Sequence, residues 1–147
     1  TQAMEYAALL NVDRVAKAPE FKDLKAKWLA AAMTAAEAEA DAVAQHRALT
    51  AISASPNAAG TLSGKAKADF DKRLKDLRKQ APVKADWESK QALDAVRAEE
   101  QKAGAARGTL LTIGQAYARI ATKYPSTEAG KQARADAERV QGILNGK

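Results

Sequence analysis

The segment that decides the fold runs from Phe21 to Ile52 and reads FKDLKAKWLAAAMTAAEAEADAVAQHRALTAI. Apolar side chains recur along it at alternating spacings of three and four residues, which is the period of one helix face. Only Gln45 interrupts the series, which consists of Phe21, Leu24, Trp28, Ala31, Ala35, Ala38, Ala42, Leu49 and Ile52. The pattern predicts one helix over 20–53 that lies against a long partner helix and approaches it closely where alanine forms the contact.

A second long apolar row runs through residues 83–124. Every seventh position is apolar, and the members of this row are Val96, Ala103, Leu110, Tyr117 and Tyr124. Gly104 and Gly108 interrupt the segment, and a glycine inside a helix costs about 1 kcal/mol relative to alanine. Because the register crosses both glycines without a shift, we expect one long helix that bends near them. The competing interpretation is two helices joined at the glycines.

Prolines mark the other helix boundaries, because proline lacks the amide donor and restricts the residue before it. They are Pro19, Pro56, Pro82 and Pro125, and the stretch SASPNAAGTLSG at 53–64 has the composition of a loop. Further helices are predicted over 2–17, 64–80 and 126–145. The predicted fold class is all-α, a single domain over 1–147 that forms an elongated helical bundle or a short α-solenoid with two long helices.

The composition excludes several classes of chemistry. The chain has no cysteine, which excludes disulfides, thiolate metal sites and cysteine nucleophiles. Its hydrophobic share is 46%, but aromatic residues supply only 5%, so much of the apolar surface is alanine and large core residues are scarce. The formal net charge of +6 is compatible with attraction to nucleic acid, to an anionic membrane or to an acidic protein surface.

One short segment carries a family resemblance. The pattern YxxIxxKYPxTEAxxxA over 117–133 resembles the junction between helices in tetratricopeptide repeats, most closely those of bacterial cell-envelope and periplasmic proteins. The resemblance implies TPR-like helical hairpins, protein binding and a periplasmic or cell-envelope location. It also implies that an aromatic and an aliphatic residue pack one helix on the next, that proline ends a helix, that Ser or Thr caps the following one and that small residues permit close crossing. The corresponding residues are Tyr117, Ile120, Tyr124, Pro125, Ser126 or Thr127, Ala129 and Ala133.

Three features invite a catalytic or ligand-binding interpretation, and each has a simpler one. His46 is the only histidine, and the simpler interpretation is an ordinary surface residue. Glu99 and Glu100 resemble a carboxylate pair, and the favoured role is either a side chain that extends from the apolar row to solvent or a salt bridge between helices. The AGAARG stretch over 103–108 lacks the GK[ST] ending of a phosphate-binding loop. We therefore predict no catalytic, cofactor-binding or metal-binding residue, and we expect neither enzyme activity nor a cofactor.

A basic cluster between Lys65 and Lys84 is the strongest functional signal. It contains eight cationic and three acidic side chains. Four of its lysines fall opposite Phe70 and Leu77 on a helix, so they form a predicted surface for a partner or for phosphates, and these four are Lys65, Lys72, Lys75 and Lys79. No aromatic residue interleaves them for base stacking.

Two functional hypotheses follow. The first is a non-enzymatic helical scaffold that binds another protein, as a monomer or a homodimer. The alternative is a basic helical protein that binds nucleic acid or an anionic membrane through the Lys65–Lys84 cluster. A purely structural coiled-coil spacer is a third interpretation, and it requires a dimer.

Overall fold

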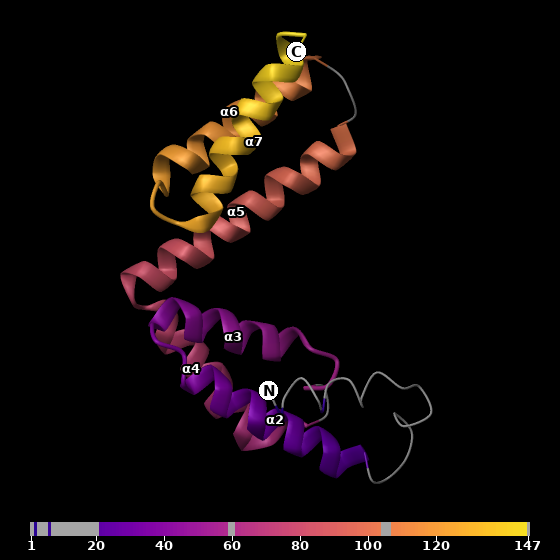
Figure 1. Ribbon diagram of the computed structural model, residues 1–147, viewed down its shortest axis with the longest axis vertical. Helices are drawn as coiled ribbons and strands as arrows, with labels where there is room; N and C mark the ends of the chain where they lie inside the picture. The colour runs from indigo at the N-terminus through magenta and orange to yellow at the C-terminus, as the bar shows by residue number, and fades with distance from the viewer. Residues whose placement is uncertain (1, 3–5, 7–20, 59–60, 104–106, 147) are drawn as a thin grey trace. The chain divides into compact units, whose positions relative to one another are not determined.

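A computed structural model describes residues 2, 6, 21–58, 61–103 and 107–146 of the chain (Figure 1). Within these ranges it contains six helices and no strand, which confirms the all-α fold class. They are α2 (Phe21–Glu37), α3 (Ala42–Ala54), α4 (Gly64–Arg78), α5 (Ala81–Ala103), α6 (Arg107–Lys123) and α7 (Glu128–Leu144). Apart from Gln2 and Tyr6, the helix predicted over 2–17 lies outside the described residues.

The chain forms two compact units, Thr1–Gln80 and Ala81–Lys147. The link between α4 and α5 is only Lys79 and Gln80, and Pro82 occupies the first turn of α5, where a missing amide donor costs nothing. No loop-like composition marks this boundary, which is why the sequence predicts one domain. The two units are described separately below, and single-domain folding over 1–147 stays a prediction.

In the first unit, α3 packs against both α2 and α4. Large side chains on each helix are buried, namely Trp28 on α2, Leu49 and Ile52 on α3, and Phe70, Leu74 and Leu77 on α4. The predicted loop separates α3 from α4 and contains Pro56. Gly64 begins α4 with φ +53°, a left-handed conformation that side-chain-bearing residues rarely adopt. The helix predicted over 64–80 is thus present as α4, and Phe70 and Leu77, opposite the four lysines, are buried as the sequence pattern predicts.

The single helix predicted over 20–53 is wrong, because α2 ends at Glu37 and α3 begins at Ala42. Asp41 starts α3 with extended backbone angles, and its carboxylate accepts hydrogen bonds of 2.8 Å from the amides of Val43 and Ala44. Ala35 and Ala38, the middle of the predicted apolar row, are exposed. Alanine removes little apolar area from water, so these positions contribute little to holding a continuous helix against a partner.

In the second unit, α6 and α7 lie side by side and α5 packs against both (Figure 1). The three helices share one apolar core. Arg97 and Glu100 on α5 contact Asp136 and Arg139 on α7 with the same offset along the chain, so these two helices run in the same direction. The core residues are Leu93 from α5, Leu110, Ile113, Tyr117, Ile120 and Ala121 from α6, and Ala129, Ala133 and Val140 from α7. Tyr117, Ala133 and Val140 have no exposed surface.

The long helix predicted over 83–124 is also wrong, and the competing interpretation of two helices is correct. The hydroxyl of Tyr117 donates to Glu100 at 2.7 Å, and that of Tyr124 donates to Glu88 at 2.9 Å. In one straight helix, residues 36 positions apart would be separated by roughly 54 Å. The chain therefore reverses between α5 and α6. Residues 104–106, including Gly104, lie outside the described residues.

The turn between α6 and α7 is closed by Thr127. Its side-chain oxygen accepts from the amide of Gly130 at 3.0 Å and donates to the carbonyl of Tyr124 at 3.1 Å. The start of α7 passes so close to this carbonyl that a Cβ on Gly130 would stand 2.7 Å from the carbonyl carbon of Tyr124. The alanines that the sequence predicts at the crossing, Ala129 and Ala133, are buried, but Gly130 makes the closest approach.

Candidate interaction surface on helix α4

Helix α4 buries one face and presents the opposite face to solvent. Its sequence, GKAKADFDKRLKDLR, places three large apolar residues at spacings of three and four, while the intervening positions are mostly charged. Each of the four lysines singled out from the sequence, Lys65, Lys72, Lys75 and Lys79, is exposed. The structure thus brings them together on the face of α4 that lies away from its core residues.

The acidic residues of α4 lie among these lysines and partly neutralise them. Lys79 contacts Asp76 at 2.7 Å, and Lys67 contacts Asp71 at 2.6 Å. The hydrogen bond and the charge of Lys79, together with the charges of Lys72 and Lys75, lower the pKa of Asp76 below its ordinary value. Ion pairs on such exposed side chains contribute only about 0–1 kcal/mol, so a partner can replace them at small cost.

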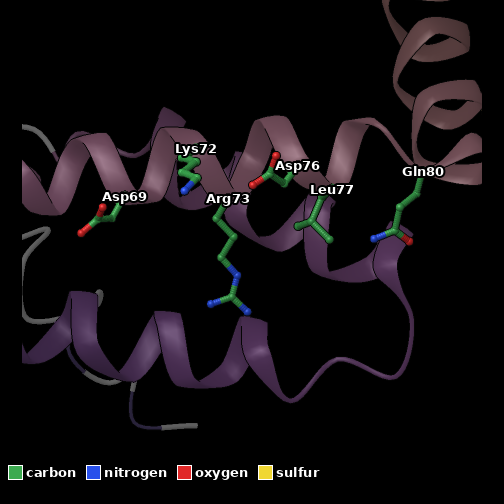
Figure 2. A pocket seen from close by; sticks show the side chains of 6 residues that line it. All are labelled: Asp69, Lys72, Arg73, Asp76, Leu77 and Gln80. Carbon is green, nitrogen blue, oxygen red and sulfur yellow. The ribbon is translucent and has the colours of Figure 1, made fainter.

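One flank of α4 forms an open groove of about 420 Å³ (Figure 2). Its lining combines both charges, an amide and one apolar side chain, from Asp69, Lys72, Arg73, Asp76, Leu77 and Gln80. Figure 2 shows Arg73 extending away from α4, and its guanidinium forms an ion pair with Glu37 at the end of α2. The groove therefore offers charged groups beside a buried leucine.

A smaller cavity of about 130 Å³ lies where the loop after α3 meets the first half of α4. It is lined by Ser53, Ala58, Leu62, Lys67, Phe70 and Asp71. Lys67 and Asp71 are already joined by their 2.6 Å ion pair. The two charged groups of this cavity are thus already paired with each other.

His46 is not a surface residue, contrary to the expectation from the sequence. It is 3% exposed on α3, and its Nε2 accepts a hydrogen bond of 2.9 Å from Nε of Arg78 on α4. Because Nε2 accepts, the imidazole is neutral in this arrangement and carries its proton on Nδ1. The residue links α3 to α4, and no sequence signal identified Arg78 as its partner.

The expected salt bridge between helices is formed by Glu100, whereas Glu99 is exposed. Glu100 accepts from Arg139 at 2.8 Å and from the hydroxyl of Tyr117 at 2.7 Å. The hydrogen bond from Arg139 is the main reason that the pKa of Glu100 lies below its ordinary value. Burial, and then the hydrogen bond to Glu100, raise the pKa of Tyr117.

Arg97 of α5 extends this network to a second residue of α7, because its guanidinium contacts the carboxylate of Asp136 at 2.8 Å. Asp136 in turn contacts Arg139 at 3.4 Å. Charged groups from α5 and α7 thus neutralise one another along the line where these helices meet. These ion pairs hold the two parallel helices in register, and their arrangement does not indicate a catalytic site.

Asp86 and Ser89 on α5 are buried polar residues that the sequence did not single out. The hydroxyl of Ser89 donates to the carbonyl oxygen of Asp86 at 2.9 Å. Throughout the described part of the chain, every buried side-chain nitrogen or oxygen has a hydrogen-bond partner. Within the same ranges, no three His, Asp or Glu side chains gather closely enough to hold a metal ion.

None of the helices in the described ranges is both long enough and apolar enough to cross a membrane. Comparisons of the chain with protein-family models, with curated proteins and with solved structures found no match.

Proposed function

We propose that this protein is a non-enzymatic helical scaffold that binds another protein through the exposed face and the groove of α4. The observation that carries the proposal is the groove itself, which is open to solvent and places Lys72, Arg73, Asp69 and Asp76 around Leu77. Protein interfaces combine an apolar centre with a charged rim in this way. The excess of cations on α4 favours a partner whose contacting surface is acidic.

The architecture supports the same proposal. Pairs of packed helices such as α6 and α7 are the units from which helical repeat proteins build extended binding surfaces. The residues that resemble a tetratricopeptide-repeat junction lie at the reversal between α6 and α7, where Tyr117 and Ile120 are buried and Thr127 caps α7. We accordingly propose a TPR-like scaffold, and with it a bacterial periplasmic or cell-envelope location.

The test is a binding titration of the full chain with a soluble acidic polypeptide such as polyglutamate, at low and at moderate salt. We expect saturable binding that weakens when the four exposed lysines of α4 are replaced together by glutamine. A matched control replaces four exposed lysines elsewhere, namely Lys22, Lys27, Lys102 and Lys131. Equal loss of binding in both variants would mean that net charge, and not α4, governs the interaction.

The alternative function is binding of nucleic acid or an anionic membrane. The observation that favours it is the placement of all four lysines on one exposed face of α4. It predicts binding of duplex DNA or phosphatidylserine vesicles that falls steeply with salt, because counterions are released from the polyanion. DNA or vesicle binding without polyglutamate binding would favour this alternative over the scaffold.

A further inference from the structure

The charged side chains of α4 lie in rows with a seven-residue repeat. Lys65, Lys72 and Lys79 form one row, which we call the lysine row; Lys79 directly follows α4 and keeps helical backbone angles as its C-cap. Asp69 and Asp76 form the aspartate row beside it. Seven residues are close to two helical turns, so successive members of a row are about 10.5 Å apart along the axis. The members of both rows are exposed.

The groove continues this order toward the core of the first unit. Beyond the aspartate row come Arg73 and Gln80, which are also seven residues apart, and beyond them Leu77, which is 8% exposed. From the exposed face inward, α4 therefore offers cations, then anions, then a guanidinium and an amide, and finally an apolar contact (Figure 2). This sequence of chemical groups defines what a complementary surface must carry.

We propose that α4 binds an amphipathic helix of an acidic partner, lying along α4, with carboxylates at every seventh position against the lysine row. This inference rests on the proposed protein-binding function and specifies the partner. A helix repeats its side chains every seven residues at the same interval of about 10.5 Å and on the same face. An adjacent row of cations on that helix meets Asp69 and Asp76, and an apolar side chain contacts Leu77.

The aspartate row is what distinguishes this partner from a polyanion. Nucleic acid and anionic lipid present negative charge only, so phosphates that approached Lys72 and Lys79 would also approach Asp69 and Asp76. Like charges at short distance oppose binding, and such repulsion is a source of specificity between partners. A helix that carries both signs in adjacent rows avoids this repulsion.

The experiment compares two synthetic peptides with the full chain in a fluorescence titration. The row peptide is a stapled helix with glutamate at every seventh position, an adjacent lysine row and leucines on the groove side. The scrambled peptide has the same composition and the same staple but breaks both rows. Because three exposed ion pairs at about 0.5 kcal/mol each amount to about tenfold in affinity, we expect the row peptide to bind about tenfold more tightly.

Charge reversal tests direct contact. The triple variant K65E/K72E/K79E should bind the row peptide with at least tenfold lower affinity. It should instead bind a reversed peptide, in which the glutamate row is changed to lysine. The matched control, K22E/K27E/K131E, makes the same change in net charge at exposed positions outside α4 and should leave the ranking of the peptides unchanged. A milder variant with glutamine in the lysine row answers the same question should the charge reversal disturb folding, which circular dichroism will show.

The outcomes separate this inference from the proposed function. Equal affinity for both peptides, with loss in the triple variant, overturns the helical partner but leaves an acidic partner on α4. Binding of neither peptide, together with binding of duplex DNA or phosphatidylserine vesicles, overturns both proposals. Tighter binding of the row peptide that the triple variant abolishes and the reversed peptide restores supports both.

Discussion

The reversal between α6 and α7 should be intolerant of any side chain at Gly130. A Cβ there would stand 2.7 Å from the carbonyl carbon of Tyr124 and closer still to its oxygen, and both are backbone atoms. Ordinary contacts of a Cβ begin at 3.4 Å, so the carbonyl carbon alone would have to move away by 0.7 Å, and the oxygen, which is nearer, by more. The Tyr124 carbonyl also accepts from the amide and the hydroxyl of Thr127. The movement therefore disturbs the cap of α7 as well.

The expected cost can be built from three contributions. Forcing an extra carbon into a packed site costs about 1–3 kcal/mol, and disturbing the Thr127 cap costs up to about 1 kcal/mol. The better helix propensity of alanine returns about 1 kcal/mol at most. Taken together, these contributions lead us to expect that Gly130→Ala lowers the free energy of unfolding by about 2 kcal/mol.

The same substitution at other glycines supplies matched controls. A Cβ on Gly142, also in α7, meets no atom within 4 Å, so Gly142→Ala should stabilise the protein by about 0.5–1 kcal/mol. Gly114 is intermediate, because its Cβ would lie 3.2 Å from a methyl group of Val140, which can shift slightly. The order of stability should be Gly142→Ala, then Gly114→Ala, then Gly130→Ala.

The assay is urea unfolding followed by tryptophan fluorescence in a Trp28→Phe background. The chain has two tryptophans, so this background leaves Trp87 in α5 to report on the second unit. The midpoint and the slope of the transition are measured for each variant. A Gly130→Ala protein that is as stable as its parent, beside a stabilised Gly142→Ala protein, would refute the close approach of α7 to the Tyr124 carbonyl.

Three further predictions concern single contacts. Asp41→Ala should cost about 1 kcal/mol because it removes the cap of α3, whereas Ser63→Ala should be nearly neutral because the Ser63 side chain makes no capping bond; urea unfolding measures both. His46→Leu should destabilise the first unit by about 1–3 kcal/mol, because the half-buried guanidinium of Arg78 loses the imidazole as an acceptor. The fluorescence of Trp28 during urea unfolding measures this change. Since the pKa of Glu100 is lowered in the folded protein, its contribution is present above its ordinary pKa of 4.5 and is lost as pH falls through the lower folded value. Glu100→Gln should therefore be less stable than the parent above pH 4.5, and the difference in the free energy of unfolding should shrink progressively as the pH is lowered below 4.5.

The sequence predicts which residues are buried better than it predicts where helices end. Leu49 and Ile52 belong to the first predicted apolar row and Leu110 and Tyr117 to the second, and all four are buried. Each row suggested one continuous helix. The seven-residue spacing of apolar residues is the same, however, when the chain reverses and the two halves of a row pack against each other. Periodicity identifies a helix face, but it does not show whether that face continues in a straight line.

The break between α2 and α3 shows the same difficulty at a site without glycine or proline. Residues 38–41 read AEAD, and the first three are good helix formers. The decisive signal is Asp41, whose short carboxylate binds the amides of Val43 and Ala44 and so favours the start of a helix over its interior. A search for N-cap residues inside the long apolar pattern would have identified this boundary.

The candidate surface was only partly predictable, because side chains far apart in sequence complete it. The exposed lysines followed from the helical period alone, but the ion pair of Arg73 with Glu37 joins residues of α4 and α2. His46 shows the reverse case, since a polar residue in a polar segment became buried once Arg78 of α4 supplied a donor. Burial of a polar group depends on its partner, and a partner 32 residues away leaves no local pattern.

The distribution of charge separates what stabilises this protein from what is offered to a partner. Between α5 and α7, the exposed Arg139 pairs with the partly buried Glu100, and replacement of Arg139 by a ligand would leave the carboxylate of Glu100 without this partner. On α4, Lys79 and Asp76 pair within one helix and remain exposed, so a competing contact costs little. Exposed pairs of this second kind also occur on α5, between Lys90 and Asp94, so exposure alone does not select α4. In the proposed interaction, a partner of α4 exchanges only such exposed pairs and therefore leaves the packing of the helices intact.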